Sequence, residues 1–134
     1  MNDLRSIPAY LMRGGTSKGL VFHKKDLPND RNLLTEYLLK IMGSPDIRQI
    51  NGIGGGTSVT SKVCIISKSL EKYVDIDYFF AQVEVDRKHV DYAPTCGNML
   101  SALGPFAIEE GLVETRNEIC LLYTSDAADE ERGG

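Results

Sequence analysis

The sequence predicts an α+β domain in which short β-strands alternate with two helices. Three observations support this class: a strand–turn–strand pattern over residues 7–23, helical spacing of apolar residues over 33–41, and β-branched or alternating segments over 59–92. The chain has 134 residues, of which 42% are hydrophobic and 25% are charged, values typical of a globular domain.

The N-terminal half supplies a predicted hairpin and a predicted helix. Ile7–Met12 (IPAYLM) is expected to form a strand, RGGTSKG a turn, and Gly19–His23 (GLVFH) the partner strand. The helix follows, with Gly43 as its C′ residue and Pro45 preventing continuation. Its apolar residues share one face and are Leu33, Leu34, Tyr37, Leu38 and Ile41.

Further strands and a second helix are expected after the glycine-rich loop Asn51–Thr57. Val59–Ser67 reads as a strand, and Asp77–Asp86 with His89–Tyr92 as a hairpin around Arg87 and Lys88. The segment that begins at Cys96 is apolar on nearly all sides, which predicts a buried helix, kinked at Pro105.

Composition changes after Val113, so we expect a domain over residues 1–113 and a tail over 114–134. The tail carries six acidic and two basic residues, whereas residues 1–113 carry 13 of each. This balance predicts no nucleic-acid partner and no association with an anionic membrane. CLLYTSDAADE resembles translated sequencing adapter, and the tail is expected to be non-native or disordered.

Cysteine usage and hydropathy predict a cytoplasmic protein. Cys64, Cys96 and Cys120 are widely spaced and odd in number, which predicts neither a disulfide framework nor a zinc site. No apolar run approaches the roughly 20 residues that span a bilayer, and the first residues have no signal-peptide pattern.

Two glycine-rich segments, Arg13–Gly19 and Asn51–Thr57, fail the phosphate-binding motifs. Lys18 precedes the last glycine of the first segment without a following Ser or Thr, and Thr57 occupies the last position of G-x-G-x-x-G in the second. Their spacing favours tight turns that need positive φ. The alternative, in which such turns bring backbone N–H groups to a carboxylate, stays open.

Lys62 and Cys96 are the residues with possible chemistry. A strand lysine is usually solvated, and Lys62 would act as an acid or base only if burial or a neighbouring cation favoured its uncharged form. A cysteine at a helix N-terminus faces the positive end of the helix dipole, which favours thiolate. The N–H groups of Gly97 and Asn98 would be unpaired there and suited to a carboxylate. The alternative for Cys96 is a buried, inert thiol.

Four segments in order, MRGGTSKG, GIGGGTSVTSKV, DYFFAQVEV and CGNMLSALGPFAIEEGLV, resemble the PrpF family of isomerases. The resemblance runs from about Ile7 to Val113 and implies a diaminopimelate epimerase-like fold, a mixed β-barrel or curled sheet around a central helix. It covers only the N-terminal, incomplete part of a family member, whose active site lies between two such domains.

The resemblance also implies site residues. Lys62 and Cys96 match catalytic positions, although Met99 follows the CGN turn where the epimerases have glycine. The substrate-binding positions implied are Thr16, Ser17, Ser61, Gly97 and Asn98. No metal and no cofactor is expected.

The implied activity is a cofactor-independent 1,3-proton shift on an unsaturated di- or tricarboxylate of the 4-oxalomesaconate or 2-methylaconitate type. The full-length protein is expected to form a homo-oligomer. The alternative is an inactive truncated fragment, at most a weak carboxylate-binding half-domain, because an interdomain site with one wall lacks catalytic geometry.

Overall fold

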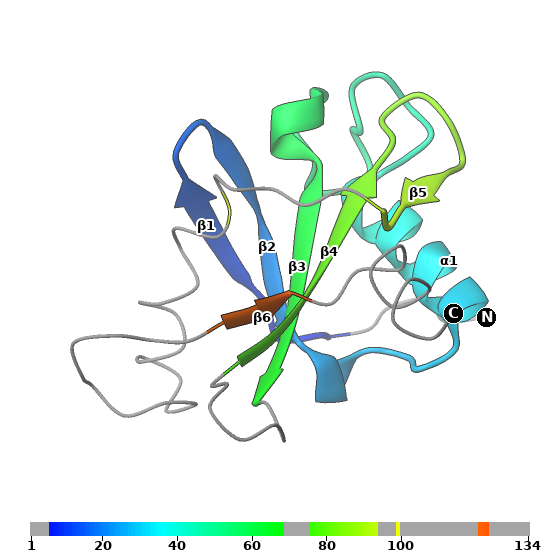
Figure 1. Ribbon diagram of the computed structural model, residues 1–134. Helices are drawn as coiled ribbons and strands as arrows, with labels where there is room; N and C mark the ends of the chain where they lie inside the picture. The colour runs from blue at the N-terminus through cyan, green and yellow to red at the C-terminus, as the bar shows by residue number, and fades with distance from the viewer. Residues whose placement is uncertain (1–5, 69–75, 94–98, 100–120, 124–134) are drawn as a thin grey trace.

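The computed structural model describes residues 6–68, 76–93, 99 and, for the backbone alone, 121–123 (Figure 1). Within these residues a mixed sheet has the strand order β1-β2-β3-β4-β5, and β6 also pairs with β4. One α-helix, α1, packs on it. The elements in chain order are β1 Tyr10–Gly14, β2 Ser17–His23, the 3-10 turn η1 Lys24–Asp26, α1 Arg31–Met42, the 3-10 turn η2 Ser58–Thr60, β3 Lys62–Lys68, β4 Ile76–Val83, β5 Val90–Asp91 and β6 Leu121–Tyr123.

The predicted N-terminal hairpin is confirmed, but its turn is shorter than expected. Antiparallel pairing of β1 and β2 continues to Gly14 and Ser17, which leaves only Gly15 and Thr16 between the strands. Gly15 has φ 54°, a conformation that suits glycine at the first position of a two-residue hairpin turn. Most of RGGTSKG therefore belongs to the strands, and β1 begins later than the predicted Ile7.

Helix α1 confirms the predicted helix and its end. Asp30 caps its first turn by accepting a hydrogen bond from the Leu33 N–H at 2.9 Å, and Gly43 ends it in the left-handed region at φ 92°. The helix connects β2 to β3, which pair in parallel, so β2, α1 and β3 form a β-α-β unit. Its buried residues are Leu34, Leu38, Leu39 and Met42.

The central strands lie close to their predicted positions, with two differences. The strand predicted from Val59 begins at Lys62, because residues 58–60 form the turn η2. The predicted hairpin partner of β4 is short: β5 pairs only with Gln82 and Val83, and residues 84–89 form the connection. The other end of β4 pairs in parallel with β6.

Each face of the sheet has its own apolar cluster. On one face α1 packs against residues such as Val63, Ile65 and Ala81, as its place beside the sheet in Figure 1 indicates. The cluster on the opposite face contains Met99, which is fully buried against side chains that include Cys64 and Phe80. The mixed sheet and α1 confirm the predicted α+β class.

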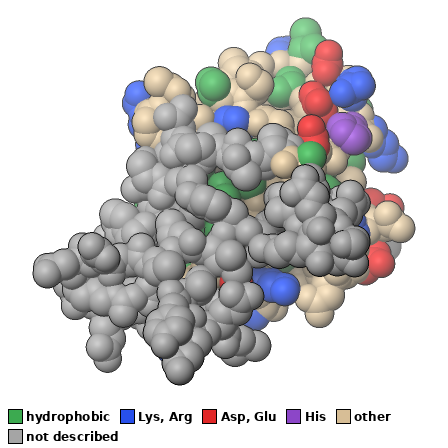
Figure 2. Space-filling model, viewed as in Figure 1, with side chains coloured by type: hydrophobic (Ala, Val, Ile, Leu, Met, Phe, Trp, Pro, Cys, Tyr) green, Lys and Arg blue, Asp and Glu red, His purple; other side chains and the backbone are tan. Residues whose placement is uncertain are grey.

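The predicted helix from Cys96, including Pro105, lies outside the described residues apart from Met99, which is helical. Strand β6 falls within residues 114–134, whose non-native origin stays a prediction. No helix in the described part of the chain is both long and apolar enough to cross a membrane. Acidic and basic side chains are interspersed near β5 on the face seen in Figure 2.

Candidate functional site

Lys62 is the first residue of β3 and is half-buried. Its Nζ donates a hydrogen bond to Oε1 of Gln82 at 2.7 Å, and the same nitrogen lies 5.3 Å from the centroid of the Phe80 ring. Lys62 and Gln82 are directly opposite in the antiparallel β3–β4 pair, so both side chains stand on one face of the sheet. The amino group of Lys62 is therefore held against β4 by a neutral acceptor and an aromatic ring.

Gln82 is itself fixed by the turn that precedes Lys62. Its Nε2 donates to the carbonyl oxygens of Ser58 at 2.9 Å and of Ser61 at 3.1 Å. Both donor hydrogens of the amide are used in this way, so Oε1 is the atom left for Lys62. The side chain of Gln82 links the η2 turn to the lysine amino group.

The tip of the β1–β2 hairpin lies near the same end of the sheet. Gly19 of β2 pairs with Lys62, and a Cβ on Gly19 would stand 2.3 Å from the Lys62 carbonyl oxygen, so only glycine fits there. Ser17, two residues earlier, shares the face of Gly19 and Lys62 and is 2% exposed. Thr16 is exposed in the turn. Both stay predicted substrate-binding residues.

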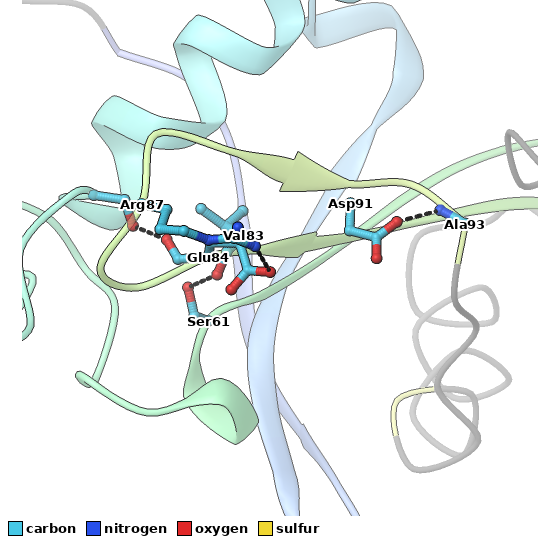
Figure 3. Close-up of polar contacts among 7 residues, drawn as sticks. Ser61, Val83, Glu84, Arg87, Asp91 and Ala93 are labelled. Carbon is cyan, nitrogen blue, oxygen red and sulfur yellow. Dashed lines mark hydrogen bonds and ion pairs between the residues drawn. The ribbon is translucent and has the colours of Figure 1, made fainter.

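Ser61 is fully buried on the other face of the sheet. Its hydroxyl donates to the Val83 carbonyl oxygen at 2.7 Å (Figure 3) and accepts from Nε2 of Gln49 at 2.8 Å. These bonds fix the backbone next to Lys62. The substrate-binding role predicted for Ser61 stays a prediction.

Gln49 organises the glycine-rich loop that precedes β3. It is 1% exposed and has φ 47°, unusual for a residue with a side chain. Its Oε1 accepts from the Gly56 N–H at 2.9 Å, and a Cβ on Gly54 would stand 2.1 Å from this same oxygen. The loop is therefore closed around one glutamine side chain.

In the loop Asn51–Thr57, the N–H groups of residues 52–56 do not face a carboxylate, which opposes the alternative left open by the sequence for this segment; for Arg13–Gly19 it stays a prediction. The amides of residues 52–56 all donate within the protein, to carbonyl oxygens of Gln49, Ile41, Met42 and Thr60 and to the Gln49 side chain. Positive φ occurs at Gly56 (76°), as predicted, but the other glycines of the loop are needed for close packing rather than for φ.

The carboxylate of Asp46 lies just before this loop in the sequence and fixes the turn that leads into it. The Asp46 side chain accepts hydrogen bonds from the backbone N–H groups of Arg48 at 3.1 Å and Ile50 at 3.2 Å. These bonds, with a smaller contribution from the Arg48 charge, lower the pKa of Asp46 below its usual value. Asp46 thus favours the turn that brings Gln49 into the interior.

Cys96, Gly97 and Asn98, the other predicted site residues, lie outside the described residues. Of this segment only Met99 is placed, and it is buried on the Lys62 face of the sheet with Cys64 and Phe80. Within the described ranges, no three His, Cys, Asp or Glu side chains are grouped to hold a metal ion.

Gln82 and Gln49 were not singled out by sequence. Gln82 carried a usable signal, because it is a neutral amide at an alternate position of the apolar strand DYFFAQV, shared with Tyr78 and Phe80. Such a residue needs partners when its face is covered. Gln49 carried no comparable signal, since its importance arises from a backbone conformation that its residue type disfavours.

Comparisons with known proteins identify the family of the chain. The family model described as PrpF protein matches residues 4–127. The 4-oxalomesaconate tautomerase of Pseudomonas putida is 58% identical over 107 residues, which are 80% of this chain and 30% of that protein. The (4E)-oxalomesaconate Delta-isomerase of Novosphingobium sp. is 49% identical over 131 residues, covering 94% of this chain and 37% of that protein.

A solved structure is similar in both fold and sequence. The crystal structure of a methylitaconate-delta-isomerase superposes with a TM-score of 0.85 at 44% identity, over 88% of this chain and 31% of that one. The chain thus spans roughly a third of the length of these relatives. A family model that matches most of the sequence, and a solved relative of the same fold at 44% identity, lead to one conclusion: the chain belongs to the PrpF family.

Proposed function

We propose that this chain supplies part of the active site of a cofactor-independent isomerase acting on unsaturated di- or tricarboxylates. The observation that carries the proposal is the placement of the Lys62 amino group, 2.7 Å from a neutral amide oxygen. In the described residues this amino group is bonded to a neutral oxygen and lies near the Phe80 ring, and no carboxylate is paired with it. The relatives, all named as isomerases or tautomerases, support the reaction class.

The proposed reaction is a 1,3-proton shift. The uncharged Lys62 amine takes a proton from a carbon next to a conjugated carboxylate or carbonyl, and the electron pair of that C–H bond enters the conjugated system. The Lys62 ammonium formed in this step, or Cys96 as a second acid, gives a proton to another carbon of the resulting dienolate, so the double bond moves and the overall composition is unchanged. Groups already oriented toward the developing charge lower the barrier.

The remaining predicted residues would complete the site. We assign the N–H groups of Gly97 and Asn98 to a substrate carboxylate, and Cys96 either to a second acid/base on the opposite face or to the wall of the carboxylate pocket. The proposed substrate-binding residues in the described part of the chain are Thr16 and Ser17 of the hairpin and Ser61, which directly precedes Lys62.

We propose 4-oxalomesaconate as the first substrate to test, with 2-methylaconitate and methylitaconate as alternatives. The enzyme is proposed to work in the cytoplasm as a homo-oligomer and without nucleic-acid or membrane partners.

A chimera tests the proposal. The matched segment of this chain replaces the corresponding 107 residues of the P. putida tautomerase, with which it is 58% identical. In D2O, the chimera should isomerise at least one of the three substrates and incorporate solvent deuterium at the reacting carbon. A folded chimera that exchanges no proton with any of them would contradict the proposal.

The coverage of about 30% favours a second candidate for the 134 residues by themselves. In this alternative, they bind a carboxylate weakly and do not catalyse. Assaying the chain alone beside the chimera tests this candidate: carboxylate binding without turnover by the chain alone supports it, and turnover by the chain alone contradicts it.

A further inference from the structure

We infer that Gln82 is a positioning residue that fixes the Lys62 amino group for proton transfer; this rests on the role proposed for Lys62. The inference begins from the hydrogen bond of 2.7 Å between Lys62 Nζ and Gln82 Oε1. The lysine side chain has four rotatable carbon–carbon bonds and, without a partner, samples many positions. A proton-transfer group must instead stay within hydrogen-bond reach of the reacting carbon.

The amide of Gln82 has one orientation available. Its Nε2 donates to the carbonyl oxygens of Ser58 and Ser61, at 2.9 and 3.1 Å. Rotating the amide by 180° would place its oxygen against two carbonyl oxygens, losing both of those bonds, and would leave the Lys62 ammonium without this acceptor. Oε1 therefore faces Lys62 as a fixed acceptor.

The chemistry of this acceptor suits a residue that must gain and lose a proton. An amide oxygen accepts a hydrogen bond from both the ammonium and the uncharged amine, so it orients Lys62 in either state. A carboxylate in the same place would favour the ammonium and oppose proton abstraction. The Phe80 ring, whose centroid lies 5.3 Å from Nζ, is a second neighbour of the amino group that carries no formal charge.

The hydrogen bonds of the Gln82 amide also connect Lys62 to the glycine-rich loop Asn51–Thr57. Ser61, whose carbonyl accepts from Gln82, is held by its own hydroxyl through Val83 and Gln49. The position of Gln82 Oε1 is thus defined by the η2 turn and, through Ser61, by the buried side chain of Gln49. This arrangement explains why a polar residue occupies a position of β4 between Phe80 and Val83, both of which are buried.

The test uses the chimera described above and replaces Gln82 by methionine, which has a similar length and shape but accepts no strong hydrogen bond. We expect kcat to fall about 10- to 100-fold, as misplacement of a reacting group by about 1 Å does. KM should change less than about twofold, because Gln82 contacts the lysine rather than the substrate. Q82N, which keeps the amide but is one methylene too short to reach Lys62, should show the same loss.

A spectroscopic measurement on the 134-residue chain separates positioning from simple stabilisation. The two Hε protons of a fixed lysine have different chemical shifts beside an aromatic ring, and in Gln82→Met those of Lys62 should merge. Thr35→Val is the matched control: it removes the 2.7 Å hydrogen bond to the Tyr92 hydroxyl on the α1 face and should leave both kcat and the Lys62 signals unchanged.

The result for Lys62→Ala separates the role proposed for Lys62 from the role inferred for Gln82. If that variant keeps full proton exchange, the proposed function of Lys62 is wrong. A different result would overturn only the inference about Gln82. In that result Lys62→Ala is inactive, but folded Gln82→Met and Gln82→Asn keep the parent kcat or lose activity only through KM.

Discussion

The α1 face of the sheet and the Lys62 face hold different kinds of contacts. The α1 face joins aliphatic residues of the helix, such as Leu38 and Leu39, to those of the strands, such as Val63 and Ile65. The Lys62 face has an apolar middle as well. At its end, Lys62 is hydrogen-bonded to the Gln82 amide, and Gly19 lies beside it in the sheet. Apolar packing is tolerant of position, whereas these polar contacts fix individual atoms. The difference predicts that substitutions in the α1 face lower stability without moving the Lys62 amino group.

Leu38→Ala makes the strongest test of this separation. Leu38 is fully buried between α1 and the sheet, so the cavity left should cost about 2–5 kcal/mol of unfolding free energy. Urea unfolding measures the loss, and the NMR shifts of the Lys62 side chain report on the other face. Loss of stability together with displaced Lys62 signals would show that the two faces are coupled.

Gln49→Ala should have the next largest effect and should act on both faces. It leaves the Gly56 N–H and the hydroxyls of Ser44 and Ser61 without this partner, at a cost of about 1–3 kcal/mol. Faster amide exchange at Gly56 is the direct measurement. The exposed neighbour Arg48→Ala is the control, and equal exchange in the two variants would contradict the organising role of Gln49.

Asp46 should give the smallest effect, detectable through its pH dependence. Because backbone hydrogen bonds lower its pKa in the folded protein, its contribution is present above the ordinary value of about 3.9 and is lost as the pH falls through the folded value. The difference in unfolding free energy between the parent and Asp46→Asn should thus be constant near neutrality and shrink below about pH 4. A difference that stays constant into acid would mean that the carboxylate is not favoured by folding.

The local elements could be predicted because their signals are local. The spacing of apolar residues and Gly43 predicted α1, including its end, and the β-branched run predicted β3. The strand boundaries were less accurate: residues 58–60 have the composition of a strand, but the mutual bonds of Thr57 and Thr60 hold them in a turn.

The candidate site was predicted only where a residue type suggests chemistry or matches the family pattern. Lys62 was found in this way, but Gln82 was not, because its contribution depends on which strand lies beside β3 and in which register. Gly19 was predicted to begin a strand after the turn, but its close approach to the Lys62 carbonyl was not predicted. Such non-local contacts cannot be derived from spacing along one chain.

The most direct test of the central claim compares two lysines of the same strand. Lys62→Ala and Lys68→Ala in the chimera remove amino groups from opposite ends of β3, the second of them exposed. Deuterium incorporation from D2O into the substrate should fall by about 100-fold or more in Lys62→Ala, the effect expected of a lost acid/base group. It should be unchanged in Lys68→Ala. Exchange at the parent rate in a folded Lys62→Ala variant would contradict the account.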